Sequence, residues 1–301
     1  MVKLDGMATF VAVAESGSIS EASRRLNFSK SVVSERLADL EKELGVRLLH
    51  RSTRKLTLTE DGATFLARAS AIMREIEEAT AELAQRRGTL VGPLRISAPV
   101  TFGRMHLGPA LYPFIAAHPG VELTLELDDR RVDAASDGYD GVVRNGPLTD
   151  SRLVAWTLAR SRRALVASPD YLVQHGRPAS AEDLQRHRGV FYTNRGVADW
   201  QFRRDGELVS VRATRALRVN NGDMMRDACE AGLGIALLPT FIVGESLRAG
   251  RLAAIDIGLP SEEEFLYVAH PEGRSPSAKL RAMTDALKAA FGDPPYWDSH
   301  G

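Results

Sequence analysis

Residues 10–62 constrain the fold of this chain most strongly, because caps and breaks divide them into short helices in a definite order. Apolar residues recur at helical spacing as far as Ala14, and Gly17 follows where a helix can end in a left-handed residue. Ser18 stands three residues before Glu21, and this pair forms a capping box that opens a second helix. The pattern therefore predicts two short helices joined by a tight turn.

A third helix completes a helix-turn-helix arrangement. The segment 27–29 breaks the apolar pattern, and Ser29 can cap a helix that Gly45 ends. The inward stripe of this helix consists of Val32, Val33, Leu37, Leu40 and Leu44. In a helix-turn-helix the first residues of the second element face the base edges of DNA, whereas a plain three-helix core is the alternative.

A basic hairpin follows the third helix and favours DNA contact over a plain core. No Asp or Glu occurs between Gly45 and Thr59, and strand-like runs flank Ser52 and Thr53. The basic side chains on this hairpin are Arg47, His50, Arg51, Arg54 and Lys55. A solvated loop is the usual explanation of such a run, but beside a helix-turn-helix it indicates a wing that contacts DNA phosphates.

The motifs of residues 22–62 resemble the amino-terminal signature of the LysR-type transcriptional regulators. The resemblance rests on Ala22-Ser23-Arg24-Arg25-Leu26, Val33-Ser34, Leu40-Glu41-Lys42-Glu43-Leu44-Gly45-Val46-Arg47-Leu48, Arg51-Ser52-Thr53-Arg54 and Leu58-Thr59-Glu60-Asp61-Gly62. Two departures fall on groove-facing positions: Lys30-Ser31 replace a common Gln-Pro, and Glu35 replaces a common Arg. The operator sequence of a relative therefore does not transfer to this chain.

The resemblance and the helix-turn-helix geometry together predict which residues contact double-stranded DNA. On the third helix they are Ser29, Lys30, Ser31, Ser34, Glu35 and Arg36, and on the wing they are Arg51, Arg54 and Lys55. Glu35 could accept from cytosine N4, or it could turn toward Arg36 or Lys42 instead. The wing arginines would enter the minor groove or bind phosphate, which contributes mainly sequence-independent affinity.

Length and charge limit the class of protein. The chain has 301 residues, too many for one compact domain, and 39 Lys and Arg balance 39 Asp and Glu. A DNA-binding protein of zero net charge must concentrate its basic residues locally, as the wing does. Residues 1–6 have no signal-peptide core and no apolar run could span a membrane, so we expect a cytoplasmic protein without a membrane partner.

A single cysteine, Cys229, excludes an internal disulfide and fits a reducing compartment. It lies within a predicted helix. We interpret it as a packing thiol rather than a redox sensor, because no second cysteine could resolve a sulfenic acid.

A long helix is predicted from the cap at Thr59 to about Arg87. Its apolar residues alternate in steps of three and four, as in a coiled-coil seam: Leu66, Ala69, Met73, Ile76, Thr80 and Leu83. The alternative is an amphipathic helix that packs on its own domain. We expect self-association along this helix into a homodimer or homotetramer, and a symmetric pair of heads would read an inverted-repeat operator.

Beyond a hinge at residues 90–93, strands and helices alternate. The predicted strands are 94–97, 121–127, 139–143, 163–167, 189–192, 217–219, 234–239, 252–257 and 265–269, and the main helices are 107–117, 132–135 and 278–291. This rhythm predicts mostly parallel sheets with ligand sites at the carboxyl ends of their strands. Crossovers at 158–163 and 261–264 would join two lobes around a cleft.

The carboxyl-terminal part resembles the effector-binding domain of the same family, which is similar to periplasmic binding proteins. The resemblance rests on Pro93-Leu94-Arg95-Ile96-Ser97, Gly138-Tyr139-Asp140, Arg144-Asn145-Gly146, Asp150-Ser151, Ser168-Pro169-Asp170-Tyr171-Leu172, Asp183-Leu184 and Ala231-Gly232-Leu233-Gly234-Ile235-Ala236. The expected fold is multidomain: an all-α winged helix-turn-helix head with a long linker helix, and a two-lobed α/β effector domain. The expected limits are 1–58 for the head, 59–88 for the linker, 89–162 with 265–301 for lobe I, and 163–264 for lobe II.

The resemblance places a small effector between the lobes, and the residue types favour an anion. The loop 99–103 links a strand to its helix, so its amides and the Thr101 hydroxyl would suit a carboxylate. The candidate effector-binding residues are Pro99, Val100, Thr101, Phe102, Arg144, Asn145, Asn194, Asn220 and Asn221. Arg144 and Asn145 are expected to follow a strand, although Arg144 could instead pair with Asp140 or Asp150. Asn220, Asn221 and Asp223 precede a predicted helix, and they could cap it instead of lining the second wall.

Catalytic and cofactor chemistry finds no support in the sequence. The seven histidines are scattered without zinc-ligand spacing, and no phosphate-binding glycine loop or nucleophile elbow occurs. We therefore expect no enzyme, no metal and no cofactor. The alternative from another class is a two-lobed solute-binding or catalytic protein, in which the amino-terminal helices serve only for dimerisation. A third interpretation is a regulator whose cleft no longer binds a ligand.

Overall fold

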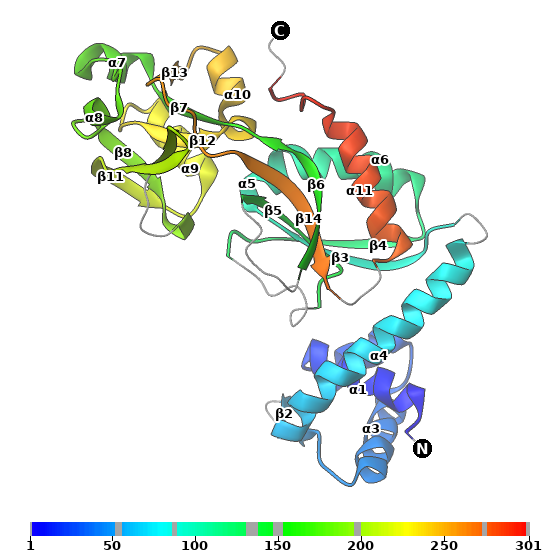
Figure 1. The fold of residues 1–301 in the computed structure, drawn as a ribbon. Coiled ribbons are helices and arrows are strands. Elements are labelled where there is room, and N and C mark those ends of the chain that lie inside the picture. Colours follow the sequence, from blue (N-terminus) through cyan, green and yellow to red (C-terminus); the bar gives the residue numbers. More distant parts are fainter. Residues whose placement is uncertain are drawn as a thin grey trace. The chain divides into compact units, whose positions relative to one another are not determined.

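The computed structural model describes residues 2–51, 56–85, 89–130, 138–146, 153–195, 200–272 and 276–298. Contacts divide the chain into two units, Met1–Gly88 and Thr89–Gly301 (Figure 1). Among the helices in the described ranges, none could span a lipid bilayer.

The first unit holds three short helices, a two-stranded hairpin and one long helix. They are α1 Leu4–Ser16, α2 Ile19–Leu26, α3 Lys30–Leu44, β1 Leu49–Arg51, β2 Leu56–Leu58 and α4 Glu60–Gln85. The caps act as predicted: Gly17 is left-handed with φ 62°, and Ser18 accepts from the amide of Glu21. The cap of α3 also forms, because the Ser29 side chain accepts from the amide of Val32.

Apolar side chains from all four helices and the hairpin form the core of this unit. Phe10, Val13, Val33, Leu37, Leu48 and Ala69 are at most 1% exposed. The hairpin begins at Leu49 rather than at the predicted Arg47. The reason is that the carboxylate of Glu41 accepts from the amides of Leu48 and Leu49, and the Thr59 hydroxyl bonds to the Arg47 carbonyl.

The predicted seam of α4 is only partly available to a partner chain. Leu66, Ala69 and Met73 pack into the core of their own unit, so the alternative interpretation holds for the first half of the helix. Ile72 and Ile76 remain 47% and 37% exposed. Among the described side chains of α4, the exposed apolar surface is therefore centred on these two isoleucines. The side chain of Leu83 lies outside the described residues.

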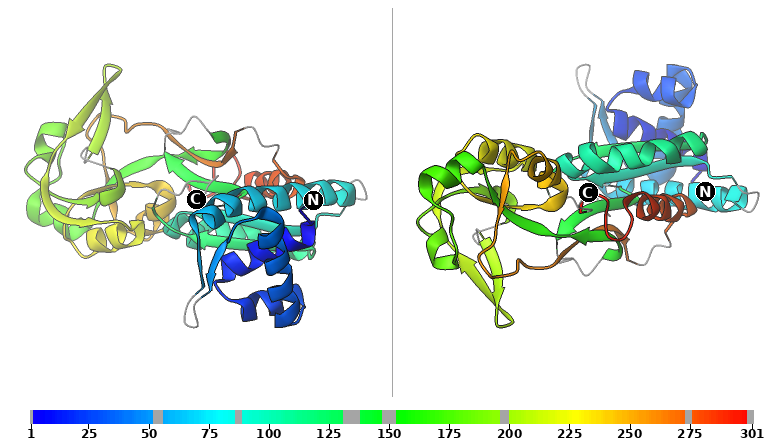
Figure 2. Two further views of the ribbon diagram at one scale, coloured as in Figure 1. Left: turned by 90° about the horizontal axis from the view of Figure 1, so that it is seen from below. Right: turned by 90° about the horizontal axis from the view of Figure 1, so that it is seen from above.

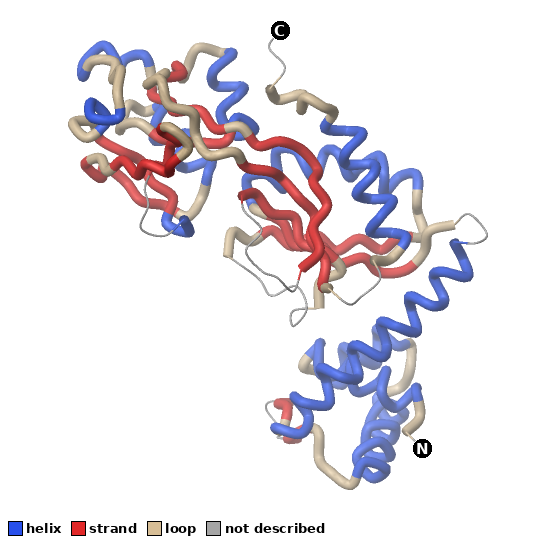
Figure 3. The backbone as a smooth tube through the Cα atoms, viewed as in Figure 1, coloured by secondary structure: helices blue, strands red, loops and turns tan. Residues whose placement is uncertain are grey.

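In the second unit, the first lobe is built on a five-stranded sheet of order β4-β3-β5-β14-β6. Its elements are β3 Gly92–Ala98, α5 Val100–Phe102, the π-helix Gly103–Leu107, α6 Gly108–Ala117, β4 Val121–Leu127, β5 Gly141–Gly146, β6 Leu153–Ser161, β14 Glu264–Pro271 and α11 Ala278–Phe291. Strand β3 is parallel to both β4 and β5, whereas β14 is antiparallel to its neighbours. Helices α6 and α11 pack against each other over this sheet (Figure 3).

The second lobe has a similar arrangement. Its elements are β7 Arg163–Ala167, α7 Pro169–His175, α8 Ala181–Leu184, β8 Arg188–Tyr192, a 3-10 turn Thr193–Arg195, β9 Trp200–Arg204, β10 Glu207–Val211, β11 Thr214–Val219, α9 Gly222–Glu230, β12 Ala236–Pro239, α10 Thr240–Arg248 and β13 Ala253–Ile255. The pair β11-β8 and the trio β12-β7-β13 are joined by a parallel bridge between Gly189 and Ile235. The hairpin β9–β10, which extends from this lobe in Figure 2, has no counterpart among the predicted strands.

The chain passes between the lobes twice, through β6 into β7 and from β13 back into β14 (Figure 1). The expected fold class, a winged helix-turn-helix head with a two-lobed α/β domain, is confirmed. The short helix predicted at 132–135 lies outside the described residues.

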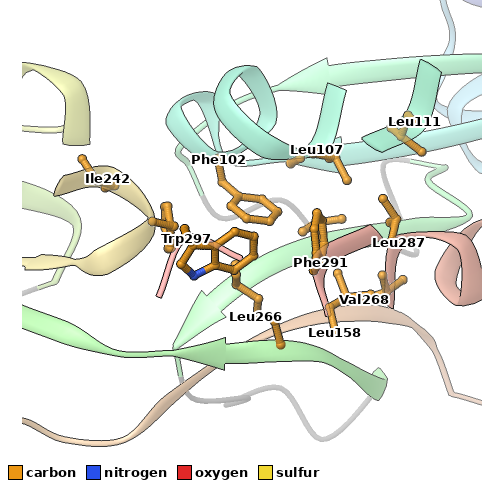
Figure 4. Packing of buried hydrophobic residues seen from close by; sticks show 14 of the residues in the cluster. Phe102, Leu107, Leu111, Leu158, Ile242, Leu266, Val268, Leu287, Phe291 and Trp297 are labelled. Carbon is orange, nitrogen blue, oxygen red and sulfur yellow. The ribbon is translucent and has the colours of Figure 1, made fainter. Parts of the chain in front are cut away.

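Near the carboxyl terminus, residues 296–297 pack against both lobes, which the sequence did not predict. The Trp297 ring lies among Phe102 and Phe291 of the first lobe and Phe241 of the second (Figure 4). His106 is hydrogen-bonded to the Tyr296 hydroxyl and to the Phe241 carbonyl, and burial lowers its pKa. These aromatic contacts add to the apolar core that the lobes share.

Gly62 generates a first prediction, because the first turn of α4 passes very close to Leu48, the residue before β1. A methyl group at Gly62 would lie 2.0 Å from the carbonyl oxygen of Leu48. We expect Gly62→Ala to lower the free energy of unfolding of the head by about 1–3 kcal/mol, as overpacking does, and to weaken DNA binding with it. Thermal melting followed by circular dichroism measures this, with Ala63→Ser at the exposed next position as control. Equal melting of the two variants would refute the close approach.

Candidate DNA-binding surface and effector site

The first turn of α3 presents small polar side chains and contains no acidic residue. Ser29, Lys30, Ser31 and Glu35 are exposed, and Ser34 is half-buried. The hydroxyls of Ser29 and Ser31 lie 2.8 Å apart. These predicted residues are therefore grouped at one end of the helix, where hydroxyl and ammonium groups can donate to bases or phosphates.

Arg36 is held beside α1 by two contacts that the sequence did not reveal. Its guanidinium lies 3.3 Å from the carboxylate of Asp5 and stacks over the Phe28 ring at 4.2 Å. The Asp5 side chain is 72% exposed, so the ion pair is weak, but the stacking fixes where the guanidinium lies. The sequence left open that Glu35 turns toward Arg36. The carboxylate that pairs with Arg36 is instead that of Asp5.

The wing is described only at its base. Strands β1 and β2 pair antiparallel, with His50 opposite Thr57. The Arg51 side chain, Arg54 and Lys55 lie outside the described residues, so their assignment to DNA contact stays a prediction.

The sequence predicted that the amide of Val100 would bind the carboxylate of an effector. In this structure a carboxylate of the chain itself accepts from that amide. Asp129 Oδ1 accepts from the amide of Val100 at 3.0 Å. Both residues follow the carboxyl ends of parallel neighbouring strands, β3 and β4, which is where open α/β sheets bind ligands.

Thr101 also contacts a carboxylate of the chain. Its hydroxyl, in a side chain only 4% exposed, donates to Asp223 Oδ2 at 3.3 Å across the lobes. Asp223 Oδ1 accepts from Arg104 at 2.8 Å and from Arg226 at 3.0 Å. The hydroxyl predicted to meet an effector therefore already joins the two lobes.

Pro99 and Phe102 flank these groups in different ways. Pro99 is half-buried at the start of α5, beside the amide of Val100. Phe102 is fully buried between Phe241 and Phe291. Its ring packs in the core and supports the loop, and its assignment to the effector site stays a prediction.

Arg144 and Asn145 lie within β5 rather than after it, which corrects the predicted strand end. Arg144 donates to Ser97 Oγ at 3.1 Å and to the Val143 carbonyl, and its burial lowers its pKa. Asp150, one of its predicted ion-pair alternatives, lies outside the described residues. The Asn145 amide donates to Glu264 at 3.1 Å, so Asn145 belongs to the crossing strands instead of the Val100 group.

Two of the three predicted asparagines of the second lobe approach Asp129. Asn194 donates to the Asp129 carbonyl at 3.0 Å, and the Asn221 side chain interacts with the carboxylate of Asp129. Asn221 also caps α9, accepting from the Met224 amide at 3.0 Å, so its capping role is confirmed and its place in the effector wall stays a prediction. Asn220 is exposed at the end of β11.

Asp129 is the residue that sequence reasoning missed, whereas Asp223 was considered together with the two asparagines that precede α9. Asp128-Asp129 directly follow the strand that pairs in parallel with β3, so strand order would have placed them beside Val100. The order of strands in a sheet is not visible in one sequence. Within the described residues, no group of three His, Cys, Asp or Glu side chains could hold a metal ion.

Comparison with known families assigns both units. The model of the bacterial regulatory helix-turn-helix protein, lysR family, matches residues 4–63, and that of the LysR substrate binding domain matches residues 87–292. This chain belongs to the LysR family. It is a transcriptional regulator with a helix-turn-helix DNA-binding domain and an effector-binding domain, as the sequence predicted.

Relatives of this LysR-family chain match over nearly its whole length. A transcriptional regulator of Escherichia coli, YhjC, is 36% identical over 95% of this chain and 97% of its own. A transcriptional repressor of Pseudomonas aeruginosa is 33% identical over 98% and 94%. The structure of CrgA, a LysR-type regulator from Neisseria meningitidis, has a TM-score of 0.61 at 29% identity, covering 96% of this chain and 99% of that one.

Cys229 of the LysR-family chain generates a second prediction. The side chain is 0% exposed in α9, and burial raises the pKa of the thiol to about 12. We expect a thiol-reactive disulfide reagent at pH 8 to leave Cys229 unmodified in the native protein and to label it after unfolding, because only the thiolate reacts. The exposed Met224→Cys in a Cys229→Ser background is the matched control. Rapid labelling of native Cys229 would contradict the packing role.

Proposed function

We propose that this LysR-family regulator reads an inverted-repeat operator as a pair of chains and responds to a small effector held between its lobes. The observation that carries the proposal is that polar contacts join the two lobes at the predicted effector loop, from Thr101 to Asp223 and from Asp129 to Asn194. A ligand that replaces these contacts has different affinities for different lobe arrangements, which is the requirement for a switch.

In this proposal, residues 1–58 read the DNA. The first turn of α3 enters the major groove, where Ser29, Lys30, Ser31 and Ser34 meet bases or phosphates, and Glu35 can accept from a cytosine amine. Arg36, placed over Phe28, reaches the backbone beside the groove. Arg51, Arg54 and Lys55 of the wing bind phosphates or the minor groove and supply affinity of low sequence dependence.

Residues 59–88 join two chains, as a homodimer or as part of a homotetramer. Support comes from the exposed Ile72 and Ile76, which the head itself does not cover. Two isoleucines in register on paired helices bury apolar surface at little cost in polar groups. Paired heads read two half-sites of an inverted repeat.

The two lobes act by binding the effector, without catalysis. Lobe I is formed by residues 89–162 and 265–301, and lobe II by residues 163–264. Relatives named as transcriptional regulators support a role without catalysis or cofactor. The helix-turn-helix family match also argues against the rival, a solute-binding protein. A protein that acts on chromosomal DNA works in the cytoplasm.

The DNA-binding assignment gives a third prediction, in which two variants behave differently. Arg54→Ala should weaken binding to operator and random DNA alike and lower the salt slope by about one unit, because one phosphate contact is lost. Ser31→Ala should instead change which operator bases are preferred. Gel retardation across salt concentrations and a randomised operator library separate these effects, with exposed Thr64→Ala on α4 as control. Identical effects of both variants on every sequence would defeat the assignment.

The effector site gives a fourth prediction. Thr101→Val keeps the side-chain shape but removes the bond to Asp223. We expect unchanged operator binding without effector and loss of the response to any small carboxylate that alters wild-type DNA retardation. The exposed Thr214→Val on β11 is the control. A Thr101→Val protein that responds as wild type does would remove Thr101 from the site.

A further inference from the structure

Asp129 lies between the lobes, where donors from both lobes contact it. Its carboxylate accepts from the amide of Val100 in the first lobe and interacts with the Asn221 side chain of the second. Its main-chain carbonyl accepts from Asn194, also of the second lobe. One residue of the first lobe thus makes two contacts with the other lobe.

The surroundings of Asp129 both attract and repel its carboxylate. Arg144, mostly buried in β5, attracts the carboxylate of Asp129 electrostatically. The guanidinium of Arg144 donates to neutral oxygens, those of Ser97 and Val143. Two features act against the bound Asp129 itself. It is half-buried, and the like charge of Asp128 lies beside it; both raise its pKa.

The neighbouring acidic residues are held differently. Asp128 forms an ion pair with Arg130, with contacts down to 2.6 Å. Asp223 is fixed by Arg104, Arg226 and Thr101 together. Asp129 has no such ion pair among the described contacts, so it is the carboxylate that can leave at least cost.

We propose that the Asp129 carboxylate is a built-in substitute for the effector, and that a small carboxylate acts by displacing it from Val100 and Asn221. The inference rests on the proposed effector site between the lobes and adds the class of the effector and the residue that competes with it. Displacement breaks the contact of Asp129 with Asn221, so the effector changes how the lobes are joined as it binds. A cationic ligand would leave the Val100 and Asn221 donors without an acceptor.

Chemical rescue of the full-length protein tests this proposal. In Asp129→Ala the site loses its carboxylate, and acetate is the probe that replaces it. We expect the variant to melt below wild type and to regain stability with saturable dependence on sodium acetate, beyond sodium chloride at equal ionic strength. Acetamide, which has the same shape without the charge, should restore much less. Wild type, whose own carboxylate competes, should need at least about tenfold more acetate, as a displaced internal ligand requires.

Asp128→Ala is the matched control, because it removes the adjacent carboxylate without touching the Val100 amide. It should show no acetate response beyond wild type. Amide hydrogen exchange gives an independent readout, in which Val100 exchanges faster in Asp129→Ala and is protected again by acetate. If Asp129→Ala does not fold, Asp129→Asn retains an acceptor for Val100 without the charge, and it should bind acetate more tightly than wild type.

Equal acetate responses of Asp128→Ala and Asp129→Ala, or none in either Asp129 variant, would overturn the role of Asp129. Gel retardation of the same proteins keeps this outcome separate from the regulator assignment. Normal DNA binding without rescue overturns only the inference about Asp129, whereas wild-type protein that retards no genomic DNA overturns the proposed function itself.

Discussion

A buried ion pair stands where the chain passes between its two lobes, and the arrangement of both lobes depends on it. Arg163 begins β7 and Glu264 begins β14, with side chains only 7% and 1% exposed and 3.7 Å between Nη1 and Oε1. Burial lowers the pKa of Arg163 to about 10. Such a pair costs desolvation energy, and breaking one partner would leave an uncompensated buried charge. The crossing strands are therefore held in one register.

The contacts around this pair extend it into both sheets. Arg163 donates to the Leu237 carbonyl at 2.6 Å in the second lobe, and Asn145 of β5 donates to Glu264 in the first. Rotation of one lobe against the other must pass through these strands. The weaker contacts, those of Asp129, Asn194 and Thr101, lie away from this register at the ends of the parallel strands, so they can change while the crossing stays intact. This division between a fixed hinge and exchangeable contacts is what a ligand-driven switch requires.

The head follows a different physical logic. Helix ends that expose backbone amides are closed by local side chains, and Ser18 and Ser29 could be identified as caps because both partners lie within three residues. The positions of Arg36 and Glu41 could not be predicted in this way. Arg36 pairs with Asp5 and Glu41 with Leu48 only because the tertiary fold brings together residues that belong to different helices and strands.

Sequence alone determined the order of elements, the helix-turn-helix, the wing and the two-lobed class, because caps, periodicity and turn residues act over a few positions. It also placed Val100, Thr101 and Asn221 at the ends of predicted elements, because the periodicity reveals where those elements stop and start. Tertiary structure alone decided that the Asp129 carboxylate accepts from the Val100 amide and that Phe102 is buried in the core. It also decided that Asn145 bonds to Glu264 at the crossing strands and that Met73 packs within its own head. These facts depend on strand order and on which helix face meets which neighbour, and such long-range choices are set by the packing of the whole unit.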